Sequence, residues 1–214
     1  MSIPLLGRTN QAFPSVWLKL EVPADLTEIP LMVEAARDSG LPLDISSRPI
    51  LWGGLMRSHT GVVIARGTTD YERSSDHTHA TDLVQSHLIE TLSCMGRDYL
   101  DFYLIPVRRA VEEFQISGAL EALESARQEG HLRYLGLVSE GPALATLGTW
   151  QFHDAFEVIA LSQTDQDAQE TLIPTARSRR VGVIQIGNQA SEDGSPVLWP
   201  VRTAQEILDL AAAQ

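Results

Sequence analysis

The stretch HLIETLSCMGRDYLDFYLI, residues 87–105, joins the end of one expected helix to an expected strand. Upstream of Gly96, apolar residues recur at helical spacing along one stripe. Gly96 is a plausible helix stop, because glycine readily adopts the left-handed conformation found after many helix ends. The bulky apolar run Phe102–Ile105 is typical of a strand that is buried on both faces. The stretch therefore predicts a helix–strand unit.

The same alternation extends over the whole chain. Short apolar runs predict up to eight strands, at Val16–Leu20, Leu43–Ile45, Val62–Ala65, Phe102–Ile105, Tyr134–Val138, Val158–Leu161, Val183–Ile186 and Val197–Trp199. Amphipathic segments between them predict helices over Leu26–Ser39, Ala80–Met95, Arg109–Glu129, Pro142–Leu147, Asp167–Arg180 and Thr203–Ala213. The last helix begins with a capping box, because Glu206 stands three residues after Thr203.

Repeated strand–helix units predict an α/β protein with a parallel sheet. Up to eight strands favour a compact, closed (β/α)8 barrel, and 214 residues lie near the lower end of about 200 for such barrels. An open doubly wound sheet is the alternative, although the sequence lacks its usual G-x-G-x-x-G fingerprint. We expect a single domain over residues 1–214, with a short polar segment, Asn188–Pro196, before the last strand.

Charge and cysteine content exclude several classes of protein. The chain has 16 Lys+Arg against 28 Asp+Glu, a formal net charge of -12, which argues against nucleic acid and anionic membranes as partners. No apolar run approaches the roughly 20 residues needed to span a bilayer, and Met1–Asn10 does not resemble a signal peptide. The lone cysteine, Cys94, excludes an intramolecular disulfide. We expect an acidic, cytoplasmic protein.

Several segments, in order and at matching spacing, resemble motifs of the aldo-keto reductases. Residues His87–Ile105 resemble that family's S-L-x-x-L-G-x-D-Y-I-D-L-Y-L-I-H, and Ala119–Ser139 resemble A-L-E-x-L-x-x-x-G-K-I-R-Y-I-G-x-S-N. Residues Glu170–Ile186 look like E-x-L-x-P-x-A-x-x-x-G-I-G-V-I-A. Leu6–Thr9 and Ala35–Asp44 resemble the family's L-G-x-T and A-L-D-x-G-I-N-x-x-D-T-A. The resemblance covers most of the chain and implies a (β/α)8 barrel.

The resemblance also implies a set of catalytic positions, most of which this chain has changed. In the family, a Tyr donates a proton to a carbonyl that receives hydride from NADPH, assisted by a Lys, an Asp and a His. Asp44 matches the Asp, but residues 45–55 contain no tyrosine and Trp52 stands nearest. Arg66 replaces the Lys, and Pro106 stands where the His is expected. A guanidinium stays charged and cannot shuttle protons. Asp44 and Arg66 are instead expected to form an ion pair.

The resemblance is also incomplete at the positions that bind the cofactor in the family. The family's S-N pair, which holds the nicotinamide amide, falls on Val138 and Ser139. Arg202, at a helix N-terminus, could hold a phosphate. Residues Asn188–Pro196 replace a longer loop that folds over the cofactor in the family. Ser139 and Arg202 are therefore the candidate NADP-binding residues, although we expect no cofactor and NADP follows only from the resemblance.

Other polar residues are candidates independently of the resemblance. Tyr71 could supply a replacement phenol, and His77 and His79 lie in the sequence DHTH after the third expected strand. These histidines are of a metal-ligating type, but H-x-H alone is a weak pattern and we expect no metal site. Lys19, the only lysine, could point into the barrel mouth, although a lysine at the solvated rim is the simpler interpretation.

Three functions remain open. The favoured one is a pseudoenzyme that has lost NADPH-dependent carbonyl reduction and binds a small-molecule ligand or a protein partner. The second is a barrel enzyme with non-redox chemistry, such as a lyase, isomerase or cyclase, and the third is a residual NADP-dependent oxidoreductase. The candidate catalytic residues are Asp44, Arg66, Tyr71, His77 and His79. The sequence leaves the oligomeric state open.

Overall fold

The computed structural model describes residues 5–57 and 59–214. Eight parallel strands form a closed barrel in chain order, as predicted, and β1 closes it by pairing with β8. The strands are β1 (Val16–Leu20), β2 (Leu43–Asp44), β3 (Val63–Arg66), β4 (Leu100–Val107), β5 (Leu132–Ser139), β6 (Val158–Ser162), β7 (Gly182–Ile186) and β8 (Val197–Val201).

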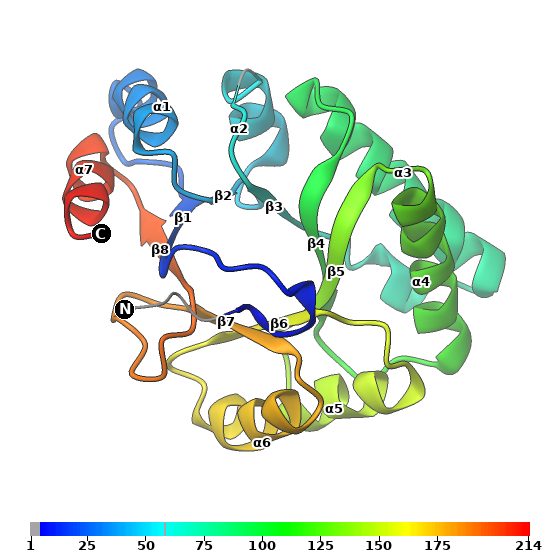
Figure 1. Cartoon of the computed structure of the whole chain (residues 1–214). Helices are drawn as coiled ribbons and strands as arrows, with labels where there is room; N and C mark the ends of the chain where they lie inside the picture. The colour runs from blue at the N-terminus through cyan, green and yellow to red at the C-terminus, as the bar shows by residue number, and fades with distance from the viewer. Residues whose placement is uncertain (1–4, 58) are drawn as a thin grey trace.

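Seven α-helices lie around this barrel in the described part of the chain (Figure 1). They are α1 (Glu28–Ser39), α2 (Pro49–Leu55), α3 (His77–Met95), α4 (Glu113–Gln128), α5 (Ala143–Phe152), α6 (Gln166–Ser178) and α7 (Ala204–Ala212). Two short 3-10 turns, η1 (Gly7–Thr9) and η2 (Asp70–Arg73), complete the elements. None of the described helices combines the length and the apolar character needed to cross a membrane.

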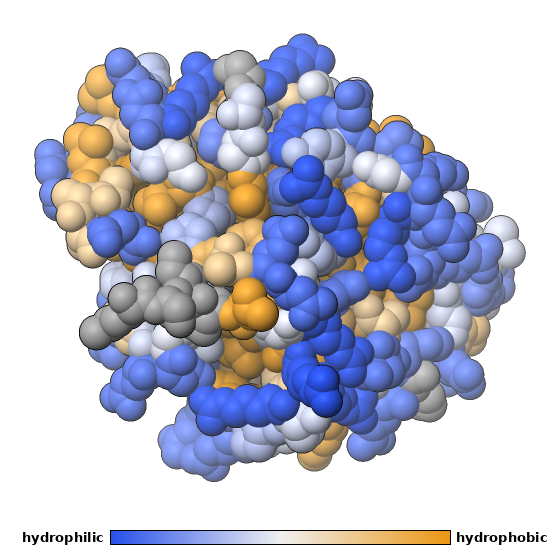
Figure 2. All heavy atoms as spheres, in the orientation of Figure 1, coloured by the Kyte–Doolittle hydropathy of each residue, from blue (hydrophilic) through white to orange (hydrophobic). Residues whose placement is uncertain are grey.

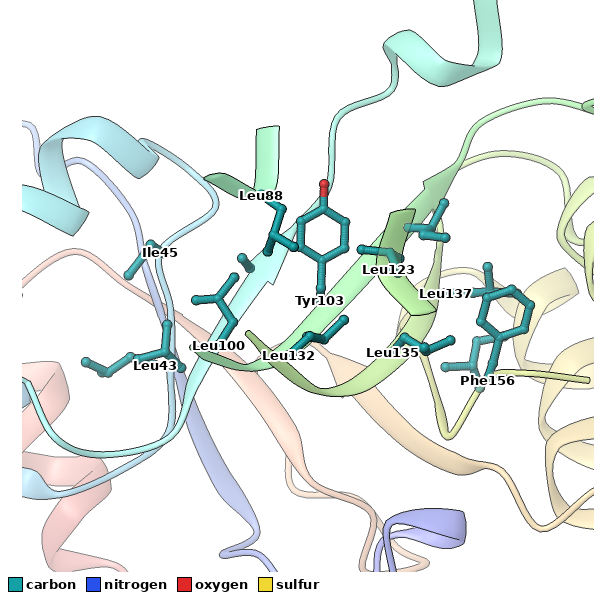
Figure 3. Packing of buried hydrophobic residues seen from close by; sticks show 14 of the residues in the cluster. Leu43, Ile45, Leu88, Leu100, Tyr103, Leu123, Leu132, Leu135, Leu137 and Phe156 are labelled. Carbon is teal, nitrogen blue, oxygen red and sulfur yellow. The ribbon is translucent and has the colours of Figure 1, made fainter. Parts of the chain in front are cut away.

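Side chains alternate between the inside and the outside of the barrel. Inner residues of the strands form one apolar cluster, which includes Trp17, Ile64, Phe102, Val158 and Ile184. The residues between them face the helices and form a second, larger cluster. Figure 3 shows part of that outer layer: Leu43, Ile45, Leu88, Leu100, Tyr103, Leu123, Leu132, Leu135, Leu137 and Phe156. Burial on both faces explains why the strands read as continuous apolar runs.

The N-terminal segment covers one end of the barrel. Leu6 and Phe13 belong to the inner cluster, and the Phe13 ring packs edge-on against Trp17 at 5.6 Å and Phe102 at 5.4 Å. Leu6 also packs against Gly182, at the beginning of β7. Figure 1 looks onto this end, where the segment crosses in front of the strands. The barrel mouth is therefore the opposite end, where the strands terminate.

The elements differ from the predicted ones in a few places. Helix α2 was not expected, although Pro49 stands at its first turn, where proline is favoured. Helix α3 begins at His77 rather than at residue 80, because the Asp76 side chain accepts a hydrogen bond from the His79 backbone N–H at 2.8 Å. Helix α5 is longer than the expected segment 142–147. Between β7 and β8, residues 187–196 contain no helix.

Candidate site at the barrel mouth

Alternation along the strands places several polar residues on the inner side of the barrel mouth. Lys19 follows the inward-facing Trp17 by two positions, and its register partner on β2 is Asp44. Arg66 follows the inward-facing Ile64 by two positions on β3. Because parallel register partners share a face of the sheet, Lys19 and Asp44 lie on the same inner side. These residues define the candidate site.

The Asp44 carboxylate is directed to the backbone of its own loop. Its side chain is 2% exposed, and it accepts a hydrogen bond from the Ser46 backbone N–H at 2.7 Å. Ser46 in turn accepts a hydrogen bond from the Arg66 backbone N–H at 2.6 Å. The expected ion pair between Asp44 and Arg66 is wrong, since the described side chains show Arg66 paired with Glu140 instead.

Glu140 binds two arginines at once. Its Oε1 lies 2.6 Å from Nη1 of Arg66, and its Oε2 lies 2.8 Å from Nε of Arg108. The hydrogen bond to this carboxylate raises the pKa of the Arg108 guanidinium. The bridge links the ends of β3, β4 and β5 across the mouth. Sequence reasoning missed Glu140, although this residue follows the inward-facing Val138 by two positions and therefore lies on the same inner face.

Tyr71 does not offer a phenol to the mouth. It is fully buried on η2, and its hydroxyl donates a hydrogen bond to the Pro106 carbonyl at 2.8 Å. Burial raises the pKa of Tyr71 far above its usual range. Trp52, the other aromatic considered for this role, is also fully buried, and its indole N–H donates to Ser47 at 3.1 Å. Both aromatic side chains therefore act as core residues.

His77 and His79 lie in the first turn of α3, and their contacts are with neighbours outside the mouth. His77 Nε2 lies 3.4 Å from a carboxylate oxygen of Glu121, and His79 Nδ1 lies 3.4 Å from the Ser75 hydroxyl. Within residues 5–57 and 59–214, no group of three or more His, Cys, Asp or Glu side chains is arranged to hold a metal ion. The structure does not join these histidines to Asp44 or Arg66.

The two candidate NADP-binding residues have internal partners around them. Ser139 is 7% exposed, and its hydroxyl accepts a hydrogen bond from Thr146 of α5 at 3.1 Å. The backbone N–H groups of Arg202 and Thr203 both donate to Glu206, at 2.6 and 3.2 Å. The next N–H, of Ala204, donates to Glu28 at 3.3 Å.

These contacts decide whether a dinucleotide phosphate fits at α7. A helix N-terminus binds phosphate through its unpaired N–H groups. Here the carboxylates of Glu206 and Glu28 accept the hydrogen bonds of those groups. A phosphate would have to displace two negative charges, so this helix end does not fit the phosphate of NADP in its present arrangement.

Lys19 is held by an acidic neighbour on its own strand end. Its ammonium lies 2.6 Å from Glu21, and the two side chains are 18% and 22% exposed. The mouth thus contains Lys19, Glu21, Asp44, Arg66 and Glu140, with each cation paired to a carboxylate. Of the five cavities described in the structure, none is lined by Lys19, Asp44 or Arg66.

Comparison with known proteins finds similarity in solved structures only. No protein-family model matches the chain, and no curated protein is significantly similar to it. An aldo-keto reductase from Bacillus halodurans, in its holo form, matches with a TM-score of 0.76 at 14% identity over 98% of this chain and 89% of that chain. An aldo-keto reductase from Klebsiella pneumoniae, in complex with NADPH, matches with a TM-score of 0.75 at 13% identity.

The Klebsiella match covers 100% of this chain and 90% of that chain. A putative aldo-keto reductase from Pseudomonas aeruginosa matches with a TM-score of 0.73 at 15% identity, over 97% of this chain and 91% of that chain. All three solved structures share with this chain the (β/α)8 barrel that the resemblance of the sequence motifs predicted. The chain therefore has the (β/α)8 barrel fold of the aldo-keto reductases.

Proposed function

We propose that this chain is an aldo-keto reductase-like barrel protein that has lost NADPH-dependent carbonyl reduction and serves as a pseudoenzyme that binds a small molecule or a protein partner. The observation that carries the proposal is the carboxylate of Glu140 between Arg66 and Arg108. Carbonyl reduction needs a proton donor whose pKa suits the reaction. At this mouth the guanidinium groups are permanently charged, and both aromatic candidates are buried.

The contacts at α7 support the same proposal. The N–H groups that would bind a phosphate already donate to Glu206 and Glu28. The net charge of -12 further disfavours an anionic dinucleotide. A solved structure with this fold holds NADPH, but at 13% identity that finding concerns the Klebsiella protein alone.

The alternative of a non-redox enzyme receives less support from the geometry. Its five candidate residues do not converge on one point in the described structure. Asp44 binds the Ser46 backbone, Arg66 binds Glu140, and Tyr71 binds the Pro106 carbonyl. The two histidines have partners on other elements. A reaction that needed these groups together would require a different arrangement of the mouth.

Titration with NADPH by calorimetry, followed by absorbance assays with a panel of aldehydes and ketones, tests the proposal. We expect no saturable NADPH binding and no oxidation of NADPH above the background rate. The Klebsiella protein crystallised with NADPH serves as the positive control for binding. Saturable binding accompanied by turnover of any carbonyl in the panel would overturn the proposal.

A matched pair of variants tests why NADPH is excluded. Glu28→Gln removes one carboxylate at the N-terminus of α7, so NADPH binding, which we expect to be too weak to saturate in the native protein, should become a few-fold stronger in the initial slope of the titration. Glu34→Gln, an exposed carboxylate on the same helix α1, should leave that affinity unchanged. Equal effects of the two variants would assign the exclusion to overall charge rather than to the contacts at α7.

A further inference from the structure

Three exposed leucines belong to the neighbouring helices α1 and α7. Leu26, in the turn that leads into α1, is 64% exposed, Leu31 of α1 is 52% exposed, and Leu208 of α7 is 49% exposed. Figure 2 shows apolar residues gathered over these two helices, with hydrophilic residues among them. A single exposed leucine needs no explanation, whereas apolar side chains that share one surface often mark an interface. We call the surface formed by these three leucines the α1–α7 face.

One hydrogen bond fixes how the two helices lie against each other. Both helices follow strands of the parallel barrel, so they run in the same direction. Their N-termini meet where the Ala204 backbone N–H donates to the Glu28 carboxylate at 3.3 Å. Leu31 follows Glu28 by three positions, a spacing that places two side chains on the same face of a helix. Leu208 follows Ala204 by four positions, so the two leucines both lie about one turn beyond this contact.

Carboxylates without a cationic partner border the α1–α7 face. Glu34 follows Leu31 by three positions, Asp209 is next to Leu208, and both carboxylates are exposed. Neither forms an ion pair with a described residue. Helix α7 contains no lysine or arginine, and the one cation of α1, Arg37, donates to a carbonyl at the end of α2. The face therefore combines apolar side chains with uncompensated negative charge.

We propose that the α1–α7 face binds an amphipathic helix of a partner protein, whose apolar stripe is flanked by lysines and arginines. The stripe covers the leucines, as an amphipathic helix does when it binds an apolar surface. The flanking cations face Glu34 and Asp209. A second copy of this chain fits less well, because a symmetric contact places the carboxylates of one copy near those of the other.

The basic helix specifies the protein partner of the proposed function, on which this assignment rests, although it binds on the outside of the barrel rather than at the mouth. A peptide of leucine and lysine, about 18 residues or five helical turns long, with its leucines at helical spacing, is the probe for the native protein. Fluorescence anisotropy of the labelled peptide measures the affinity. We expect saturable binding of one peptide per chain. A peptide of the same composition in scrambled order controls for general attraction to an acidic protein, and should bind at least about tenfold more weakly.

A matched pair of leucine variants locates the bound peptide. Leu208→Gln removes an apolar anchor, so the peptide should bind about tenfold more weakly. Leu144→Gln replaces a leucine that is 72% exposed on α5, and it should leave the affinity unchanged. Because both side chains are exposed, both variants should unfold at the same temperature as the native protein.

A second pair of variants tests the contribution of charge. Asp209→Asn removes one carboxylate that borders the face, so binding should weaken by a few-fold and become less sensitive to salt. Asp82→Asn removes an exposed carboxylate from α3 and changes the net charge by the same amount. It should leave both the affinity and its salt dependence unchanged. Equal effects of the two variants would mean that the peptide responds only to overall charge, which would contradict the proposal.

Three further results would overturn the proposal: equal binding of the scrambled peptide, binding that does not saturate, or equal binding by the native protein and Leu208→Gln. Analytical ultracentrifugation tests the other occupant. A dimer that Leu208→Gln dissociates would assign the face to a second copy of the chain, and a native monomer supports the basic partner. Turnover of NADPH would overturn the proposed function without changing peptide binding, so the two failures are distinguishable.

Discussion

Arg66 shows how a single residue type determines the chemistry available at the mouth. A lysine at this strand end can lower the pKa of a neighbouring phenol and can itself lose a proton, whereas an arginine remains charged. Arg66 lies 2.6 Å from Glu140, which also binds Arg108. The result is a bridge between three strand ends in place of a proton-transfer site.

Replacing Tyr71 tests whether its hydroxyl stabilises the fold or takes part in catalysis. Tyr71→Phe removes the hydroxyl that donates to the buried Pro106 carbonyl, so the free energy of unfolding should fall by about 1–2 kcal/mol. Urea denaturation measures the change. Tyr134→Phe, whose hydroxyl makes no hydrogen bond among the described residues, is the matched control and should change stability less. An unchanged stability for Tyr71→Phe would contradict the structural role.

At the scale of elements, residues at the start of α7 form hydrogen bonds with each other that cap the N-terminus of this helix. The Thr203 hydroxyl accepts a hydrogen bond from the Glu206 backbone N–H at 3.2 Å, and Glu206 accepts from the Thr203 N–H. The capping box was predicted from the sequence and is confirmed. Its spacing is local, so the pattern of residues was sufficient to find it. The contribution of Glu28, from α1, required the tertiary structure.

Replacing the helix-capping residue Thr203 should measurably destabilise the folded protein. Thr203→Ala should lower the free energy of unfolding by about 1 kcal/mol, because the first turn of α7 loses a hydrogen-bond acceptor. Thermal or urea denaturation measures this loss. Thr27→Ala is a matched control, since Thr27 precedes α1 without a side-chain hydrogen bond to the helix, and it should cost less than about 0.5 kcal/mol. Equal losses in both variants would argue against the capping box.

At the scale of the whole molecule, the ring of helices is interrupted between β7 and β8. Residues 187–196 cross from one strand to the next without a helix. The Gln163 side chain holds this crossover, because its amide donates to the Gln189 carbonyl at 2.7 Å and its oxygen accepts from the Gln189 N–H at 3.2 Å. Arg177 of α6 pairs with Asp193 at 2.7 Å.

Gln163→Ala should loosen the crossover without unfolding the barrel. The loss of these hydrogen bonds should increase amide exchange over residues 187–196 by about tenfold, while exchange in the strands stays the same. Hydrogen–deuterium exchange with mass spectrometry measures both regions. Gln166→Ala is the control, because the Gln166 side chain bonds, among the described residues, only to Glu170 on its own helix. Faster exchange throughout the molecule would mean that Gln163 supports the barrel itself.

The sequence by itself determined the order of the strands and of six of the seven described helices, and it favoured a closed barrel over an open sheet. Those properties follow from local patterns: apolar runs such as residues 102–105 form buried strands, and Gly96 ends a helix in the left-handed conformation. Helix α2 was not predicted, because its seven residues are too few to show a helical periodicity of apolar residues.

Only the tertiary structure decided the partners at the mouth. Arg66 and Glu140 are 74 residues apart in the chain, and Tyr71 and Pro106 are 35 apart. Barrel closure brings such groups together, and competition among neighbouring carboxylates then selects the pairs. Residue types at one strand end were therefore enough to place Asp44 and Arg66 in the same region, but not to predict that Arg66 would pair with Glu140.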